Sequence, residues 1–295
     1  MAPILPQHFD KNCRPMNIKT STAPRDRFKF HRRKINLTAY QECLISRGTV
    51  RGNTMRVQLF STCLVDTFYP ETAEAVVKLL RHFGCDVVYP RGQTCCGKPA
   101  DSGGYEREAR AAAKHFIKVF SGEEPIVVPS GSCASMVKNH YPMLLDNDKS
   151  WKSKATDLAQ RVYELSQFLV HILKAHEREF RWEGSVTYHA SCQLTRELGV
   201  RDEPLTLIQC IKGVEFKPMP YADRCCGFGG IFMVKQPEIS MALADDKLDT
   251  IMASGAETVI GCDHGCLMNI EDAVRRRGAN IKVKHLAVLL AEALP

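Results

Sequence analysis

The sequence lacks several features that would assign it to a common protein class. No apolar run reaches the roughly 18 residues that a membrane-spanning helix needs, so no membrane span is predicted. The N-terminus lacks the apolar core and the small-residue cleavage site of a secretory signal, so a cytoplasmic location is expected. No phosphate-binding loop and no Ser–His–Asp arrangement is apparent. The spacing of Gly227, Gly229 and Gly230 differs from that of a dinucleotide-binding fingerprint.

Acidic residues are scarce only at the start of the chain. The net charge is +7, but residues 1–54 hold eleven Lys/Arg and three Asp/Glu, so the remainder is close to neutral. No nucleic-acid partner is therefore predicted for the body of the protein, and a basic arm for nucleic acid or anionic lipid is the less favoured interpretation of the leader. With no sustained helical or strand period, residues 1–54 are expected to be disordered, or to be upstream sequence read in frame from a misassigned start.

From Met55 onward the sequence repeats one unit. Cys63 and Cys192 are 129 residues apart, Cys95 and Cys225 are 130 apart, and Cys133 and Cys266 are 133 apart. Three landmarks that keep one offset indicate an internal duplication. The sequence therefore predicts a first cysteine-rich domain over 55–150, a connecting segment over 151–183 with a helix at 157–173, and a second domain over 184–295.

Each half alternates short apolar runs with helical patterns. Strands are expected at 56–61, 86–90, 125–129, 185–190, 214–220 and 257–261, and helices at 70–84, 103–120, 204–212 and 237–255. This alternation predicts an α/β fold of two duplicated βαβαβα units with parallel sheets. The cysteines follow the strand ends, and sites in parallel α/β folds gather outside the carboxyl ends of the strands. Cysteines far apart in the sequence should therefore converge.

Thirteen cysteines in a chain without an export signal indicate metal or redox chemistry rather than disulfides. The chain has neither the C-x-x-C hooks of zinc ribbons nor the C-x-x-C-x-x-C run of ferredoxins. Adjacent cysteines are awkward for one small ion and suit two neighbouring irons, so an iron–sulfur cluster is favoured over zinc. The candidate ligands are Cys63, Cys95, Cys96 and Cys133 in the first half, and Cys192, Cys225, Cys226, Cys262 and Cys266 in the second.

The repeated Cys…Cys-Cys-Gly…Cys layout of residues 55–295 resembles the cysteine-rich CCG domain. That domain occurs in heterodisulfide reductase, in the iron–sulfur subunits of glycolate oxidase and anaerobic glycerol-3-phosphate dehydrogenase, and in lactate utilization protein A. Several of these relatives carry an additional ferredoxin-type domain, which the chain lacks. The segments QLFSTCLVDTFYPE, CCGKPADSGG, VPSGSCASMV and CCGFGGIFMV are most similar to the lactate utilization subfamily.

The resemblance implies one or more [4Fe–4S] clusters of non-cubane type. It also implies an electron-transfer subunit that oxidises L-lactate to pyruvate together with partner subunits bearing ferredoxin-type clusters. The alternatives are a thiol/disulfide oxidoreductase subunit like that of heterodisulfide reductase, a glycolate oxidase-type iron–sulfur subunit, and a zinc-stabilised binding protein without redox activity.

Other residues near the cysteines have both structural and functional interpretations. His189 and His264 could donate a hydrogen bond to a cluster sulfur or be ordinary structural histidines. Gly97 and Gly227 are interpreted as letting backbone N–H groups approach the cluster. Cys85 and Cys210 are expected to be core residues. Because Cys262 has no counterpart in the first half, it is a weaker ligand candidate than Cys266, and the first half is expected to bind its cluster less firmly or to accept zinc.

Overall fold

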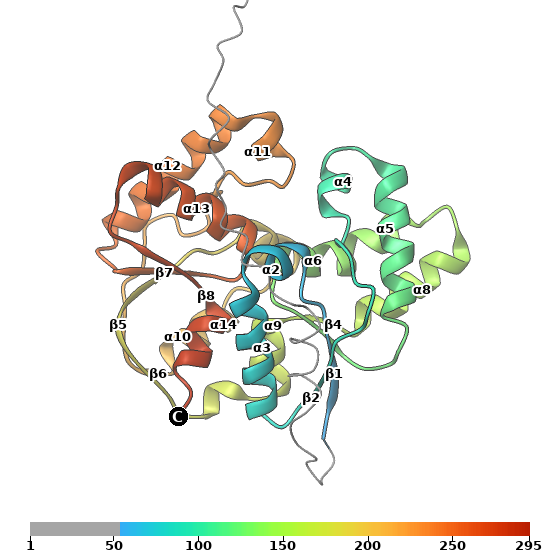
Figure 1. Ribbon diagram of the computed structural model, residues 1–295, viewed down its shortest axis with the longest axis horizontal. Coiled ribbons are helices and arrows are strands. Elements are labelled where there is room, and N and C mark those ends of the chain that lie inside the picture. Colours follow the sequence, from blue (N-terminus) through green and yellow to red (C-terminus); the bar gives the residue numbers. More distant parts are fainter. Residues whose placement is uncertain (1–53) are drawn as a thin grey trace, which may run out of the picture. The chain divides into compact units, whose positions relative to one another are not determined.

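A computed structural model describes residues 54–295, so residues 1–53 of the predicted leader lie outside the described range. The described residues contain two four-stranded parallel sheets with helices between the strands (Figure 1). The sheet orders are β2-β1-β3-β4 and β6-β5-β7-β8, which are the same order in each half. The predicted α/β fold of two duplicated parallel units is therefore confirmed.

The first half begins with β1, and its elements follow in chain order. They are β1 (Arg56–Leu59), α2 (Cys63–Phe68), α3 (Pro70–His82), β2 (Asp86–Val88), α4 (Lys98–Ser102), α5 (Glu106–Val119), β3 (Ile126–Val128), α6 (Gly131–Ser135), η1 (Met136–His140), α7 (Tyr141–Leu144), α8 (Lys149–Gln160), β4 (Val162–Glu164), α9 (Leu165–Gln167) and η2 (Phe168–Ile172).

The second half repeats this order with a longer first strand. Its elements are η3 (Ala175–Glu177), β5 (Phe180–Tyr188), η4 (Gln193–Glu197), α10 (Glu203–Gln209), β6 (Ile211–Phe216), α11 (Phe232–Lys235), α12 (Pro237–Ala253), β7 (Thr258–Gly261), α13 (His264–Arg277), β8 (Lys282–His285) and α14 (Leu286–Glu292). No helix among residues 54–295 has the length and apolar character needed to cross a bilayer.

The prediction of one continuous connecting helix over 157–173 is wrong, because a strand interrupts it. Helix α8 ends at Gln160, and Val162–Glu164 form the edge strand β4, which pairs in parallel with β3. The segment is apolar at helical spacing, but the exposed edge of β3 offers backbone partners that a helix would leave unpaired. The sequence patterns do not predict the equivalent strand β8 either, and the two strands complete matching sheets.

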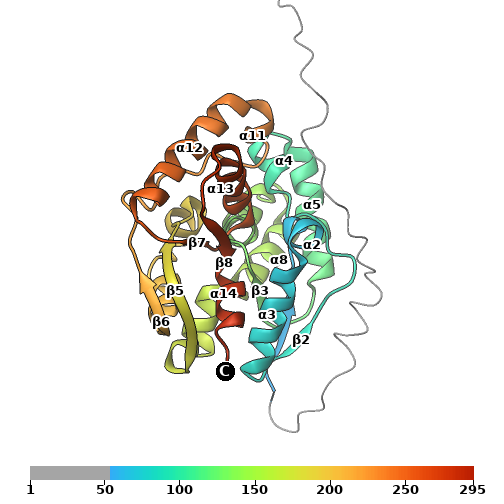
Figure 2. The ribbon, with the colours of Figure 1, turned by 60° about the vertical axis from the view of Figure 1, so that its left-hand side comes forward.

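The helix after each of these edge strands packs against the opposite half. Helix α14 of the second half packs against α3 of the first, and Lys78 of α3 donates a hydrogen bond to the carbonyl oxygen of Ala291 at 2.7 Å (Figures 1 and 2). In return, α9 and η2 of the first half pack against α10 of the second. The halves therefore exchange helices and belong to one compact unit, which takes in the described residues 54–295.

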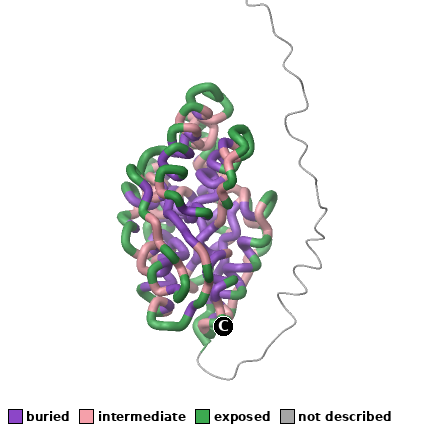
Figure 3. Tube along the Cα trace, turned by 90° about the vertical axis from the view of Figure 1, so that its left-hand side faces the viewer, coloured by how far each residue is buried: buried purple, intermediate pink, exposed green. Residues whose placement is uncertain are grey.

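The buried residues run along the strands and the inner faces of the helices, and the outer loops are exposed (Figure 3). The strand order places a topological switch point between β1 and β3, and another between β5 and β7. Cys63 and Cys133 follow β1 and β3, while Cys192 and Cys266 follow β5 and β7. Open parallel sheets bind ligands at such switch points, so the fold itself directs these cysteines to the same place.

Candidate metal centre

Eight of the nine candidate cysteines line a single cavity of about 590 Å³ between the two halves. Four come from each half, and none of the cysteines of residues 54–295 is in a disulfide. We call these sets the first quartet (Cys63, Cys95, Cys96 and Cys133) and the second quartet (Cys192, Cys225, Cys226 and Cys266). The duplication therefore brings two four-thiol sets to one place.

The halves meet in the wall of this cavity, at the N-termini of α6 and α13. The Asp263 carboxylate accepts hydrogen bonds from the Ser130 hydroxyl at 3.1 Å and from the backbone N–H of Ser132 at 2.8 Å. The backbone N–H of Gly131 donates to the Cys262 carbonyl oxygen at 3.2 Å. These contacts fix the position of one quartet relative to the other.

Within each quartet the thiols lie close enough to share protons. Hydrogen bonds from Cys63 and Cys96 lower the pKa of Cys95 to about 3, and those from Cys192 and Cys226 lower the pKa of Cys225 to about 2. The same hydrogen bonds, together with burial, raise the pKa of Cys63 and of Cys192. Four adjacent thiols cannot all ionise unless a positive metal compensates their charge, so each quartet has the donor chemistry of a metal or cluster site.

The backbone around each cysteine pair is held by equivalent hydrogen bonds. The Tyr141 hydroxyl donates to the Cys96 carbonyl oxygen at 2.7 Å, and the Asn269 amide donates to the Cys226 carbonyl oxygen at 2.7 Å. The N–H of Gly227 donates to Cys225 Sγ at 3.3 Å. The last contact is a backbone approach of the kind predicted for a glycine after the cysteine pair.

Both predicted glycines occupy positions where a side chain would not fit. Gly97 and Gly227 have φ of +87° and +82°. A Cβ on Gly227 would lie 2.5 Å from the Ser240 carbonyl oxygen, and one on Gly97 would lie 3.0 Å from Ala112 Cβ. The glycines thus allow α12 and α5 to pack against the cysteine loops.

We expect Gly227→Ala to destabilise the protein by about 2–5 kcal/mol, because the cost of a left-handed backbone at alanine adds to the cost of steric overlap with α12. Gly255→Ala is the matched control: its φ is +67° but nothing lies within 4 Å of the new Cβ, so a cost of only about 1 kcal/mol is expected. Thermal unfolding of the two variants measures the difference. Equal losses in the two variants would show that close packing at Gly227 is unimportant.

Cys262 does not line the cavity. Its buried thiol accepts a hydrogen bond from the Tyr188 hydroxyl at a donor–sulfur distance of 3.9 Å, at the end of β7. The expected difference of one thiol between the halves is therefore not found at the cavity. Cys85 is buried and Cys210 is half-buried, and neither lines the cavity.

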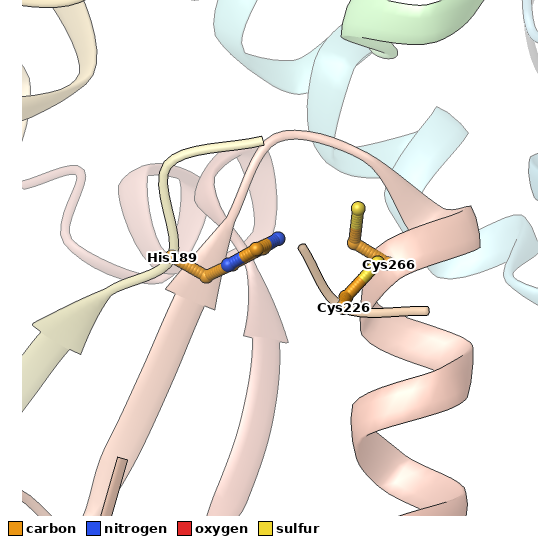
Figure 4. Close-up of side chains that lie close together, drawn as sticks. All are labelled: His189, Cys226 and Cys266. Atoms are coloured by element: carbon orange, nitrogen blue, oxygen red, sulfur yellow. The ribbon is translucent and has the colours of Figure 1, made fainter. Parts of the chain in front are cut away.

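The two candidate histidines occupy different environments. His264 lines the cavity, where its Nε2 hydrogen-bonds the Thr72 hydroxyl at 2.8 Å and its ring stacks on Tyr69 at 4.1 Å. Burial and His285 hold its pKa well below the usual range, so the ring is neutral. His189 lies behind the second quartet: one ring nitrogen is within 4.8 Å of Cys226 Sγ and Cys266 Sγ (Figure 4). A hydrogen bond from Cys226 lowers the pKa of Cys266 to about 6, and His189 contributes to the shift.

The sequence interpretation missed Lys247 of α12, which is fully buried. Its ammonium donates to the carbonyl oxygens of Tyr221 and Ala222 at 3.0 and 3.2 Å. Burial lowers its pKa to about 8, while attraction to Cys226 and Cys266 acts in the opposite direction. Lys247 follows Ser240 and Ala244 on the buried face of the helix. A lysine at a position whose helical spacing predicts burial could have identified it from the sequence.

A second missed group joins the halves beside the cavity. Glu197, which lines the cavity, accepts hydrogen bonds from the Ser135 hydroxyl and, at 3.1 Å, from His140. The other ring nitrogen of His140 lies 3.0 Å from the Asp101 carboxylate. Burial would raise the pKa of Glu197, but the hydrogen bonds from Ser135 and His140 lower it overall. These contacts bind the first half to the second.

Comparison with known proteins finds the same domain in both halves. The CCG cysteine-rich domain matches residues 57–138 and 186–271. Lactate utilization protein A of Geobacillus sp. (strain WCH70) is 47% identical over 236 residues, which are 80% of this chain and 99% of the relative. The protein of the same name from Anoxybacillus flavithermus is 48% identical over the same shares, and lactate utilization protein A 2 of Bacillus cereus (strain Q1) is 45% identical over 81% and 99%.

Proposed function

Because the chain belongs to the CCG cysteine-rich domain family, with lactate utilization protein A relatives along nearly their whole length, we propose that it is an iron–sulfur electron-transfer subunit of a complex that oxidises L-lactate to pyruvate. The observation that carries the proposal is the convergence of two cysteine quartets on one cavity. An iron–sulfur cluster, when bound, supplies one-electron transfer.

The chain's own residues then have defined roles. The first and second quartets would hold the clusters, with [4Fe–4S] of non-cubane type as the expected form. Gly97 and Gly227 allow the neighbouring helices to pack closely, and the N–H of Gly227 supports Cys225. The cavity wall also carries apolar side chains, among them Leu64, Phe228 and Met268, which would shield part of a bound cluster from water. The proposed setting is the cytoplasm, with partner subunits that carry ferredoxin-type clusters and oxidise the lactate.

A cavity of about 590 Å³ also favours a second candidate function. It is within the usual size range of small-ligand pockets. A thiol/disulfide oxidoreductase would bind a small disulfide there and reduce it with two electrons and two protons. If the substrate of the complex is glycolate and not lactate, the chain is a glycolate oxidase-type iron–sulfur subunit. Zinc, in the first quartet or in both, is the alternative metal.

Deleting the gene tests the proposed function. We expect growth on L-lactate as sole carbon source to stop and growth on pyruvate to be unaffected, with recovery on re-expression of the intact chain. Normal growth of the deletion strain on lactate would contradict the proposal, and a defect on glycolate alone would favour the glycolate alternative.

Anaerobic purification followed by iron, sulfide and zinc analysis tests the cofactor separately. We expect iron and sulfide in similar amounts, as in iron–sulfur clusters. Zinc alone would leave only the structural interpretation of the cysteines. Rapid reduction of a small disulfide by the dithionite-reduced protein would favour the disulfide reductase alternative.

A further inference from the structure

The residues beneath the two quartets differ in chemistry at one structurally equivalent position. Phe60 lies three residues before Cys63, and His189 lies three residues before Cys192. The N–H of Phe60 donates to the Val127 carbonyl oxygen at 3.0 Å, and the N–H of His189 donates to that of Ile260 at 2.8 Å. Since Val127 and Ile260 each precede the last cysteine of their quartet by six residues, Phe60 and His189 are structural counterparts.

The surroundings of the two side chains match their chemistry. Phe60 belongs to the apolar cluster that contains Cys96 and Cys133, and it packs edge-on against Phe116 with ring centroids 4.9 Å apart. His189 is only 1% exposed, and its ring points from the end of β5 toward Cys226 and Cys266 (Figure 4). Neither ring nitrogen has a hydrogen-bond partner elsewhere among residues 54–295. A buried imidazole without another partner is available to donate its N–H to a cluster sulfur.

A second difference lies on the helix after each cysteine pair. A Cβ at Gly97 would meet Ala109 and Ala112, and a Cβ at Gly227 would meet Ser240 and Leu243, which sets an offset of 131 between α5 and α12. By this offset the counterpart of Lys247 is Phe116, the residue that packs on Phe60. The first quartet therefore lies over two phenylalanines, and the second lies beside a histidine and a buried lysine.

We propose that His189 and Lys247 make the second-quartet site the one with the higher reduction potential, so that an electron arriving at the first site passes to the second. This inference rests on the proposed function. In that transfer a cluster held by the first quartet would lose one electron, and a cluster held by the second quartet would gain it. Reduction adds a negative charge, which a cation and a hydrogen-bond donor stabilise, and both effects are stronger in a buried, low-dielectric site. The nearby Asp223 and Arg224 act on Lys247 in opposite directions. The Asp263 carboxylate disfavours negative charge on Cys192 and Cys266, so the combined effect of His189 and Lys247 must exceed it.

The test is a redox titration of the full-length, anaerobically purified protein, followed by electron paramagnetic resonance. We expect two midpoint potentials. His189→Phe and Lys247→Met should each lower the higher midpoint potential by about 59 mV, which is a tenfold change in the equilibrium constant of a one-electron reduction. The reciprocal change Phe60→His should raise the lower one. Lys217→Met removes a partly exposed cation of the same half that bonds Gly255, and it should shift neither.

The possible outcomes separate this inference from the proposed function. A wild-type protein without iron and sulfide contradicts the proposed function, whereas iron retained with unchanged potentials in both His189→Phe and Lys247→Met contradicts only the inference. If His189→Phe loses iron, the role of His189 is tested instead with His189→Gln, because glutamine keeps an N–H donor. A potential close to wild type in His189→Gln supports the inference, and one as low as in Lys247→Met overturns the role of His189.

Discussion

Cys225→Ser is expected to remove about half of the bound iron and sulfide, and Cys96→Ser the other half, because each variant breaks a different quartet. The double variant should bind almost none. A serine hydroxyl is a far weaker acid and a harder donor than a thiol, so it replaces a thiolate ligand poorly. Cys225 is the exposed member of the second quartet and Cys96 is a buried member of the first, so the pair tests both quartets and both environments.

Two further cysteines serve as controls for this result. Cys210 is half-buried, and its thiol donates to the Leu207 carbonyl oxygen at 3.1 Å, away from the cavity. Cys262 is buried beside Tyr188 and does not line the cavity. Cys210→Ser and Cys262→Ser should therefore keep the wild-type iron content. Iron and sulfide analysis after anaerobic purification measures all five variants. Full iron in Cys225→Ser, or an equal loss in Cys210→Ser, would refute the assignment of the quartets.

The sequence was sufficient to predict the duplicated α/β fold, because the cysteine landmarks keep an offset of 129 to 133 residues and each follows an apolar run. It also placed the cysteines at the carboxyl ends of the strands. The edge strands β4 and β8 could not be predicted, since Val162–Glu164 is too short to show an alternating pattern and lies within a helical apolar period. Their formation depends on pairing with β3 and β7, which is a tertiary effect.

The relative position of the two quartets could not be predicted from the sequence either. A repeat offset describes each unit but not how the units pack on one another. The single cavity depends on contacts such as that between Ser132 and Asp263, which lie 131 residues apart. The special environment of Lys247 depends on the loop that carries Tyr221 and Ala222 and folds over its ammonium. Such partners become visible only when the chain is folded.

The exchanged helices have a large expected effect on stability. Helix α14 buries Leu286, Leu289 and Leu290 between the second sheet and α3 of the first half. Each buried leucine contributes about 1.5–3 kcal/mol, so the three together approach the total stability of about 5–15 kcal/mol of a typical domain. Neither half can therefore be treated as an independently stable domain, since each is completed by a helix from the other.

We expect a chain truncated after His285 to lose cooperative thermal unfolding and to bind little iron at either quartet, although every cysteine candidate is still present. The loss should include the first quartet, because α3 follows directly on the helix that begins with Cys63 and loses its packing partner. A chain that ends at Ala293 keeps α14 and the hydrogen bond from Arg181 to the Ala293 carbonyl oxygen, so it should behave like the intact protein. Circular dichroism and iron analysis follow both properties. A truncated chain that unfolds cooperatively and keeps the iron of its first quartet would show that the exchange of helices does not support the site.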